Sequence, residues 1–147
     1  MSKSVPKIVS FASSVAAEHS APDAARVLAG RPVLTTRNYY ADAAQKFFSG
    51  IWSSTVGKWR VSYGEHEFCS LLEGRVRLAS DDGVVTEFDV GDSFVIPCGF
   101  TGTWETLAPC RKLYVIYLPP APRPKARRVV GRMIRKKKSS GAPKGRP

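Results

Sequence analysis

The chain has 147 residues, which is long enough for one domain with a modest core and too short for two. Its apolar content of 43% is ordinary for a globular protein, and no stretch approaches the roughly 20 apolar residues of a membrane-spanning helix. The net charge is +11, yet residues 1–120 contain 12 basic and 12 acidic side chains, whereas residues 121–147 contain 11 basic and no acidic ones. The expected domain therefore gives no indication of an anionic partner.

The cellular compartment is inferred from the N-terminus and the cysteines. Two lysines precede the run over residues 8–12, and the serine at its centre makes it too short and polar for a secretory signal. The three cysteines lack C-x-x-C spacing, which argues against a disulfide framework and against a zinc ribbon. We therefore expect a cytoplasmic protein. The cysteines are Cys69, Cys98 and Cys110.

The first 30 residues are expected to form an N-terminal arm with one short helical segment. Asp23 can cap a helical run over residues 24–29, and Gly30 can end it. From residue 31 onward, Thr, Val, Tyr, Trp and Phe recur in short runs between Gly, Pro and Asp clusters, which is typical of β-strands. The expected strands cover residues 32–39, 47–54, 58–63, 67–73, 74–79, 84–89, 93–96, 101–106 and 111–118.

The spacing of these runs predicts the fold class. Ser80-Asp81-Asp82-Gly83 has the composition of a hairpin turn, since glycine supplies a positive φ. Short strands without a long amphipathic helix between them predict an antiparallel sandwich or barrel over residues 31–118. Four prolines between residues 119 and 124 cannot join a sheet and indicate a boundary. Residues 119–147 are then a proline-rich linker and a disordered basic tail.

The tail has two interpretations. Apolar residues recur at spacings of three and four between Ala126 and Ile134, and arginines surround them. Residues 121–147 could thus contain a basic amphipathic helix that binds an anionic membrane surface or nucleic acid. The alternative is a disordered extension that only increases solubility.

Two segments resemble the conserved motifs of a known family. The first is E-F-C-S-L-L-E-G over residues 67–74, and the second is G-D-S-F-V-I-P-C-G over residues 91–99. They resemble the two motifs of the cupin superfamily, which are small jelly-roll barrels that commonly hold a metal. Over about residues 5–118 the chain looks like the single-domain cupins related to the (S)-ureidoglycine aminohydrolase cupin domain. The resemblance implies an all-β jelly-roll barrel and, by analogy, a homodimer.

The metal ligands of that family are mostly missing from this sequence. Metal-binding cupins have H-x-H three or four residues before the motif glutamate and another histidine three residues after the last glycine of the second motif. Of these four ligands only Glu67 is present, and the neighbouring His66 points to the opposite face of a strand. The other family positions are occupied by Val61 and Tyr63 or by Arg60 and Ser62, and by Gly102.

We therefore expect the usual metal centre to be absent, because a lone carboxylate holds a divalent cation poorly. The alternative is an improvised metal site formed by Glu67, Cys69 and Cys98, with Tyr63 near them. A carboxyl group among aromatic side chains favours its neutral form unless a cation pairs with it. Glu67 is accordingly the candidate catalytic acid or base, or an anchor for a polar ligand.

The candidate ligand-binding residues lie on strands expected to surround the barrel interior, and Lys112 and Tyr114 share one face of the last strand. Lys112 supplies a cation opposite Glu67 if its face of the last strand points inward, and is a solvated surface lysine if that face points outward. Trp104 follows the second motif and can stack on a planar ligand. The alternative for this residue, and for Trp52, Trp59, Tyr63 and Tyr114, is a place in the core or a dimer interface. The predicted ligand-binding set is Tyr63, Cys69, Trp104, Lys112 and Tyr114.

The leading hypothesis is a cupin that binds a small ureide-like, amide or acidic molecule in its barrel, and it leaves open whether the chain is an enzyme. The fold alone does not decide, because cupins host many chemistries and many binders. One alternative is a non-enzymatic dimeric scaffold whose basic tail binds nucleic acid. Another is a metal-dependent enzyme with atypical ligands.

Overall fold

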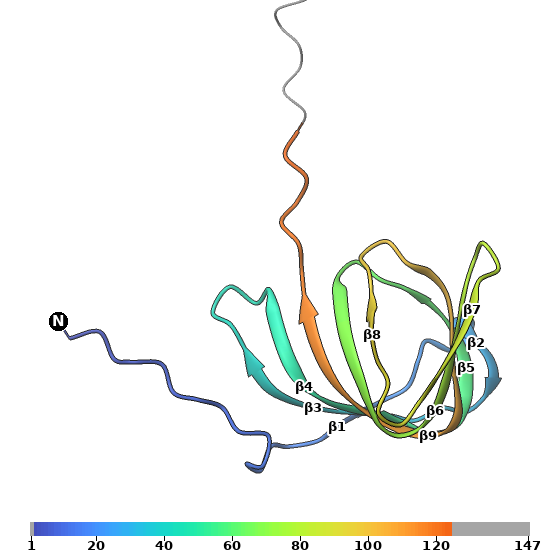
Figure 1. Ribbon diagram of the computed structural model, residues 1–147, viewed down its shortest axis with the longest axis horizontal. Coiled ribbons are helices and arrows are strands. Elements are labelled where there is room, and N and C mark those ends of the chain that lie inside the picture. Colours follow the sequence, from blue (N-terminus) through green and yellow to red (C-terminus); the bar gives the residue numbers. More distant parts are fainter. Residues whose placement is uncertain (1, 125–147) are drawn as a thin grey trace, which may run out of the picture.

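The computed structural model describes residues 2–124, so the tail beyond them, with its candidate helix, lies outside the described residues. The described chain consists of antiparallel strands and one short 3-10 turn, which confirms the all-β class (Figure 1). The elements are β1 (Glu18–Ser20), η1 (Ala24–Arg26), β2 (Val27–Gly30), β3 (Leu34–Ala41), β4 (Phe47–Ser54), β5 (Gly57–Ser62), β6 (His66–Ser80), β7 (Val85–Asp89), β8 (Ser93–Ile96) and β9 (Thr101–Tyr117).

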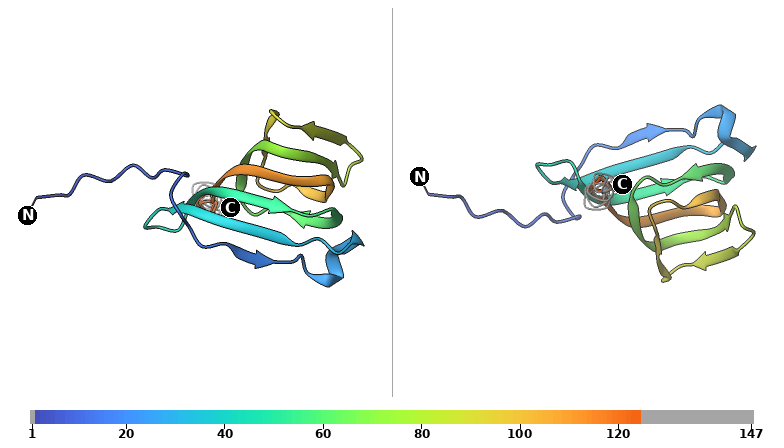
Figure 2. Two further views of the ribbon diagram at one scale, coloured as in Figure 1. Left: turned by 90° about the horizontal axis from the view of Figure 1, so that it is seen from below. Right: turned by 90° about the horizontal axis from the view of Figure 1, so that it is seen from above.

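Two long strands form the centre of the sheet. β6 and β9 pair with each other along most of their lengths. On its other edge β6 pairs first with β8 and then with β7, while the other edge of β9 pairs first with β5 and then with β4. β3 extends the sheet beyond β4, β1 lies outside β3, and β2 lies outside β5. The sheet curls into a half-barrel with one hollow face (Figure 2).

The expected division of residues 67–79 into two strands is wrong, because β6 continues through Gly74. The register between β6 and β9 shifts on both sides of Glu73 and again after Arg75, so β6 has an irregular, bulged region there. Gly74 has φ of 83°, and a Cβ at this position would collide with the carbonyl oxygen of Pro109. The glycine of the first motif therefore bends a strand rather than ending it.

The expected break between residues 106 and 111 is also absent, because β9 runs through Pro109. β5 pairs with β9 up to Thr106, and β4 pairs with it from Cys110 onward. Pro109 lies in the gap between these two neighbours, where the strand tolerates a residue that cannot donate a hydrogen bond.

The N-terminal helical segment is shorter than expected. Asp23 caps it as predicted, because its carboxylate accepts a hydrogen bond from the Ala25 N–H at 3.2 Å. The helix is one 3-10 turn, however, and the chain continues as β2, which pairs with β5. β1 and β2 of the expected arm thus belong to the sheet, and the Phe11 ring stacks on that of Tyr39, whereas the chain before Phe11 extends away from the sheet (Figure 1). The domain boundaries remain predictions.

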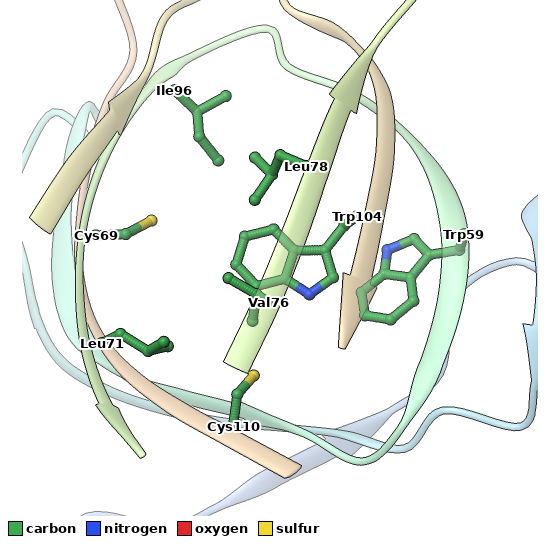
Figure 3. Packing of buried hydrophobic residues seen from close by; sticks show 8 residues of the cluster. All are labelled: Trp59, Cys69, Leu71, Val76, Leu78, Ile96, Trp104 and Cys110. Carbon is green, nitrogen blue, oxygen red and sulfur yellow. The ribbon is translucent and has the colours of Figure 1, made fainter. Parts of the chain in front are cut away.

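The hairpin turn at residues 80–83 is confirmed between β6 and β7, with φ of 95° at Gly83. The core fills the concave side of the sheet, where Trp59 and Trp104 lie near one another across from Cys69 and Leu71 (Figure 3). Within the described residues no helix is long and apolar enough to cross a membrane.

Candidate ligand cavity

A cavity of about 670 Å³ occupies the hollow of the half-barrel. Its walls come from β3, β4, β5, β6 and β9, and residues 18–26 contribute one side of its mouth. The lining residues that matter for the chemistry are Glu18, Asp23, Arg26, Asn38, Trp52, Trp59, Arg60, Tyr63, Glu65, Glu67, Trp104, Lys112 and Tyr114.

A buried ion pair is the central feature of this cavity. The Nζ atom of Lys112 lies 2.8 Å from Oε1 of Glu67, and the two side chains are only 4% and 8% exposed. Side chains alternate along a strand, so Glu67 and Cys69 share the inner face of β6. Lys112 projects from β9 toward them and also donates to the Cys69 Sγ atom at 3.4 Å. Lys112 therefore points inward.

Two indole rings complete the surroundings of the ammonium group. The Lys112 Nζ atom lies 4.6 Å from the centre of the Trp52 ring and 4.4 Å from that of Trp104. Trp104 is held in place because its Nε1–H donates to the Thr106 hydroxyl at 3.0 Å. Burial, the largest single effect, lowers the pKa of Lys112, but the charge and hydrogen bond of Glu67, together with Cys69 and Tyr63, outweigh it and hold the pKa above its usual value. The ammonium is thus a fixed cation with π-faces and a carboxylate around it.

The thiol and phenol groups near the pair keep their protons at neutral pH. Burial raises the pKa of the Cys69 thiol to about 12, so Cys69 is a neutral hydrogen-bond partner and not a nucleophile. Burial also raises the pKa of Tyr63, and it raises that of Tyr114 to about 12. The Tyr114 hydroxyl donates to the Asn38 side-chain oxygen at 2.8 Å, which joins β9 to β3 on one wall.

Most of the predicted site residues gather around the ion pair. Tyr63, Glu67, Trp104, Lys112 and Tyr114 line the cavity. Cys69 contacts Lys112 but is fully buried and is not among the lining residues. Cys98 does not join them. It is exposed in the turn after β8, where its backbone N–H donates to the His66 ring at 3.0 Å.

Several polar lining residues were not predicted from the sequence as part of the site, among them Glu18, Asp23, Arg26, Asn38 and Glu65. Glu18 and Arg26 were assigned to a separate arm, and Asn38 lies on a strand with no motif. Glu65 could have been predicted, because it precedes Glu67 by two residues and the alternation of side chains along an extended chain would place both on one face. Burial and the Glu67 charge raise the pKa of Glu65.

The side chains around Glu67 do not fit the metal ion that the resemblance to cupins implies. Within residues 2–124 no three His, Cys, Asp or Glu side chains converge as metal ligands. A divalent cation bound to Glu67 would also lie against the ammonium of Lys112. At the last family position, a side chain on Gly102 would collide with the carbonyl oxygen of Ala79. Within the described residues, the cation beside the Glu67 carboxylate is thus the Lys112 ammonium.

Comparison with known proteins supports this fold. A family model described as an EutQ-like cupin domain matches residues 41–114. A DUF861-family protein of unknown function from Pseudomonas syringae is 25% identical with a TM-score of 0.65, over 74% of this chain and 46% of that one. The present chain thus spans less than half of that protein's length. No curated protein sequence matches the chain.

Two further structures show likeness in fold alone. A putative ethanolamine utilization protein Q from Salmonella typhimurium is 19% identical with a TM-score of 0.53, over 58% of this chain and 69% of that one. The EutQ protein of Clostridium difficile is 16% identical with a TM-score of 0.54, over 61% of this chain and 71% of that one. The finer resemblance to ureidoglycine aminohydrolase cupins remains a prediction.

Proposed function

The chain belongs to the EutQ-like cupin domain family, and from this premise we propose that its barrel binds a small polar organic molecule without a metal ion. The observation that carries the proposal is the buried Lys112–Glu67 pair at a cavity of about 670 Å³. Burying two charges is expensive, and apolar residues of similar volume would often be as stable or more so. A pair kept in a cavity wall is therefore better explained by a ligand than by stability.

The cavity offers three kinds of contact to such a ligand. Lys112 occupies one carboxylate oxygen of Glu67, and the other can accept a hydrogen bond from a ligand N–H. Indole rings provide stacking surfaces for a planar group. The Asn38–Tyr114 pair, on β3 and β9, provides polar atoms. Amides, ureides and small acids combine a planar group with donors and acceptors, and they are the ligand classes we propose.

If the bound molecule is also converted, Glu67 is the candidate proton acceptor. Its carboxylate lines the cavity, and a carboxylate that takes up a ligand proton acts as a general base. Lys112 would then balance the charge and orient the carboxylate. Turnover by such a mechanism needs no metal-bound water.

The test is ligand binding in the presence of a chelator. Amides, ureides and small carboxylic acids are screened by thermal shift with EDTA, and hits are measured by calorimetry. We expect binding that Glu67→Gln weakens at least about tenfold, because one charge-assisted hydrogen bond is lost. Glu73→Gln is the matched control, since Glu73 lies on the same strand, is 61% exposed and pairs with Arg111. Binding that requires added metal, or that Glu67→Gln leaves unchanged, would contradict the proposal.

A second candidate function rests on the charge distribution. All 11 excess positive charges of the chain lie in residues 121–147, and dense positive charge attracts nucleic acid phosphates without any fold. In this alternative the barrel is a homodimeric scaffold and the tail binds DNA or RNA. Salt-sensitive binding that disappears when residues 121–147 are deleted would support it, and light scattering would test the dimer.

A further inference from the structure

The charges at the mouth of the cavity do not balance. Among the lining residues that the structure describes, three carboxylates form no ion pair. Arg26 is the one described lining cation that also forms none. Arg60 also lines the cavity, but Asp81 engages its guanidinium at 3.0 Å. Lys112 is neutralised by Glu67. The mouth thus has an excess of negative charge. The three carboxylates belong to Glu18, Asp23 and Glu65.

These carboxylates lie in a cavity whose rings already hold one cation. The indoles of Trp52 and Trp104 face the Lys112 ammonium at 4.6 and 4.4 Å. The third indole, of Trp59, lies 6.3 and 6.5 Å from these two rings and also lines the cavity, as does Tyr63. A cavity lined by both aromatic faces and unpaired carboxylates suits a cationic ligand group.

Glu65 is the best-placed carboxylate for such a group. It lies in the bend just before β6 and lines the same cavity as Glu67, so the two carboxylates repel each other, and only the Glu67 charge has a cation beside it. A ligand cation near Glu65 would relieve this repulsion. Glu18 reaches the cavity from β1, close to the Tyr114 side, and adds a second negative charge.

We propose that the ligand of this cavity carries a cationic nitrogen group, such as an amidinium, guanidinium or ammonium, which binds between the Glu65 carboxylate and the aromatic wall. This inference rests on the proposed binding function and adds the charge of the ligand to it. A planar cation satisfies both features at once, because its N–H groups donate to the carboxylate while its face stacks on an indole.

The test uses three probes of the same shape and different charge: benzamidinium, benzamide and benzoate. Each is titrated into the full-length protein by calorimetry at pH 7 and low salt. We expect benzamidinium to bind roughly tenfold more tightly than benzamide and benzoate more weakly still, because one partly exposed charge contact has this order of effect. Added NaCl should weaken benzamidinium binding and leave benzamide unchanged.

Two variants connect this preference to the residues. Glu65→Gln should bring the affinity for benzamidinium close to that for benzamide, without changing the affinity for benzamide. Glu18→Gln, at an exposed position on β1, should also weaken benzamidinium binding, and it replaces Glu65→Gln in the test if that variant fails to fold. Glu73→Gln, outside the cavity, should change neither affinity.

The proposal is overturned if benzoate binds as tightly as benzamidinium, if no probe binds, or if both cavity variants leave benzamidinium affinity unchanged. Its failure can be told apart from that of the binding function. Neutral or acidic ligands that bind in a Glu67-dependent way, without any preference for benzamidinium, would refute only the cationic group. A cavity that binds none of these probes, amides, ureides or acids would refute both.

Discussion

Removing the cation of the buried pair should destabilise the protein strongly. Lys112→Met keeps most of the side-chain volume and the contact with the two indoles, but it leaves the Glu67 carboxylate buried without its partner. Both groups are less than one tenth exposed, so solvent screens the pair little. Breaking a buried pair on one side costs about 3–5 kcal/mol. We expect a loss of this size at pH 7.

The companion variant replaces both charges with apolar groups. Glu67→Leu combined with Lys112→Met removes the pair without leaving an unpaired charge, so most of the lost stability should return. The coupling between the two substitutions should reach about 2–3 kcal/mol. Urea unfolding at pH 7, followed by tryptophan fluorescence, measures the free energy of unfolding of the wild type, the two single variants and the double variant. A loss below about 1 kcal/mol for Lys112→Met, or losses that simply add in the double variant, would refute an interdependent pair.

Three further predictions concern the thiols, a strand bend and alkaline pH. In the native protein only Cys98 should react rapidly with a thiol reagent at pH 8, and all three cysteines should react in denaturant. Gly74→Ala should lower the free energy of unfolding by about 2 kcal/mol or more, because the position combines a positive φ with a backbone collision. Gly83→Ala, which has open space around it, should lower it by about 1 kcal/mol, and urea unfolding compares the two variants. The pKa values of Cys69 and Tyr114 are raised from 9.0 and 10.0 to about 12. These groups stabilise the fold fully at a pH below their pKa values in the unfolded chain, and this stabilisation is lost as the pH rises toward 12. The urea midpoint should therefore fall between pH 8 and 11, and an unchanged midpoint would contradict the prediction.

Sequence patterns were most informative where alternation and turn chemistry decide the structure. The hairpin at Gly83 and the shared inner face of Glu67 and Cys69 follow from such local rules. The inward direction of Lys112 was left open, because a lysine suits both a solvated face and a buried ion pair. Only the pairing of β9 with β6 places its ammonium at Glu67.

Long-range pairing explains what sequence analysis missed. Gly74 and Pro109 look like strand breakers, yet Gly74 lies at a bulge of β6 and Pro109 lies in the gap between β5 and β4, so β6 and β9 continue through them. The run 24–29 has helix-forming residues, but the free edge of β5 pairs with its second half. Because these residues join the sheet, Arg26 reaches the cavity mouth, which no local pattern indicated.

The central claim is that Lys112 takes the place of a metal ion at Glu67. The most direct measurement is elemental analysis of the untagged protein after incubation with zinc, manganese, iron and nickel salts and desalting, with Glu67→Ala treated in parallel. We predict far less than one metal ion per chain, and no difference between the two proteins. Near-stoichiometric metal in the wild type that Glu67→Ala abolishes would contradict the claim and favour a metal-dependent enzyme with atypical ligands.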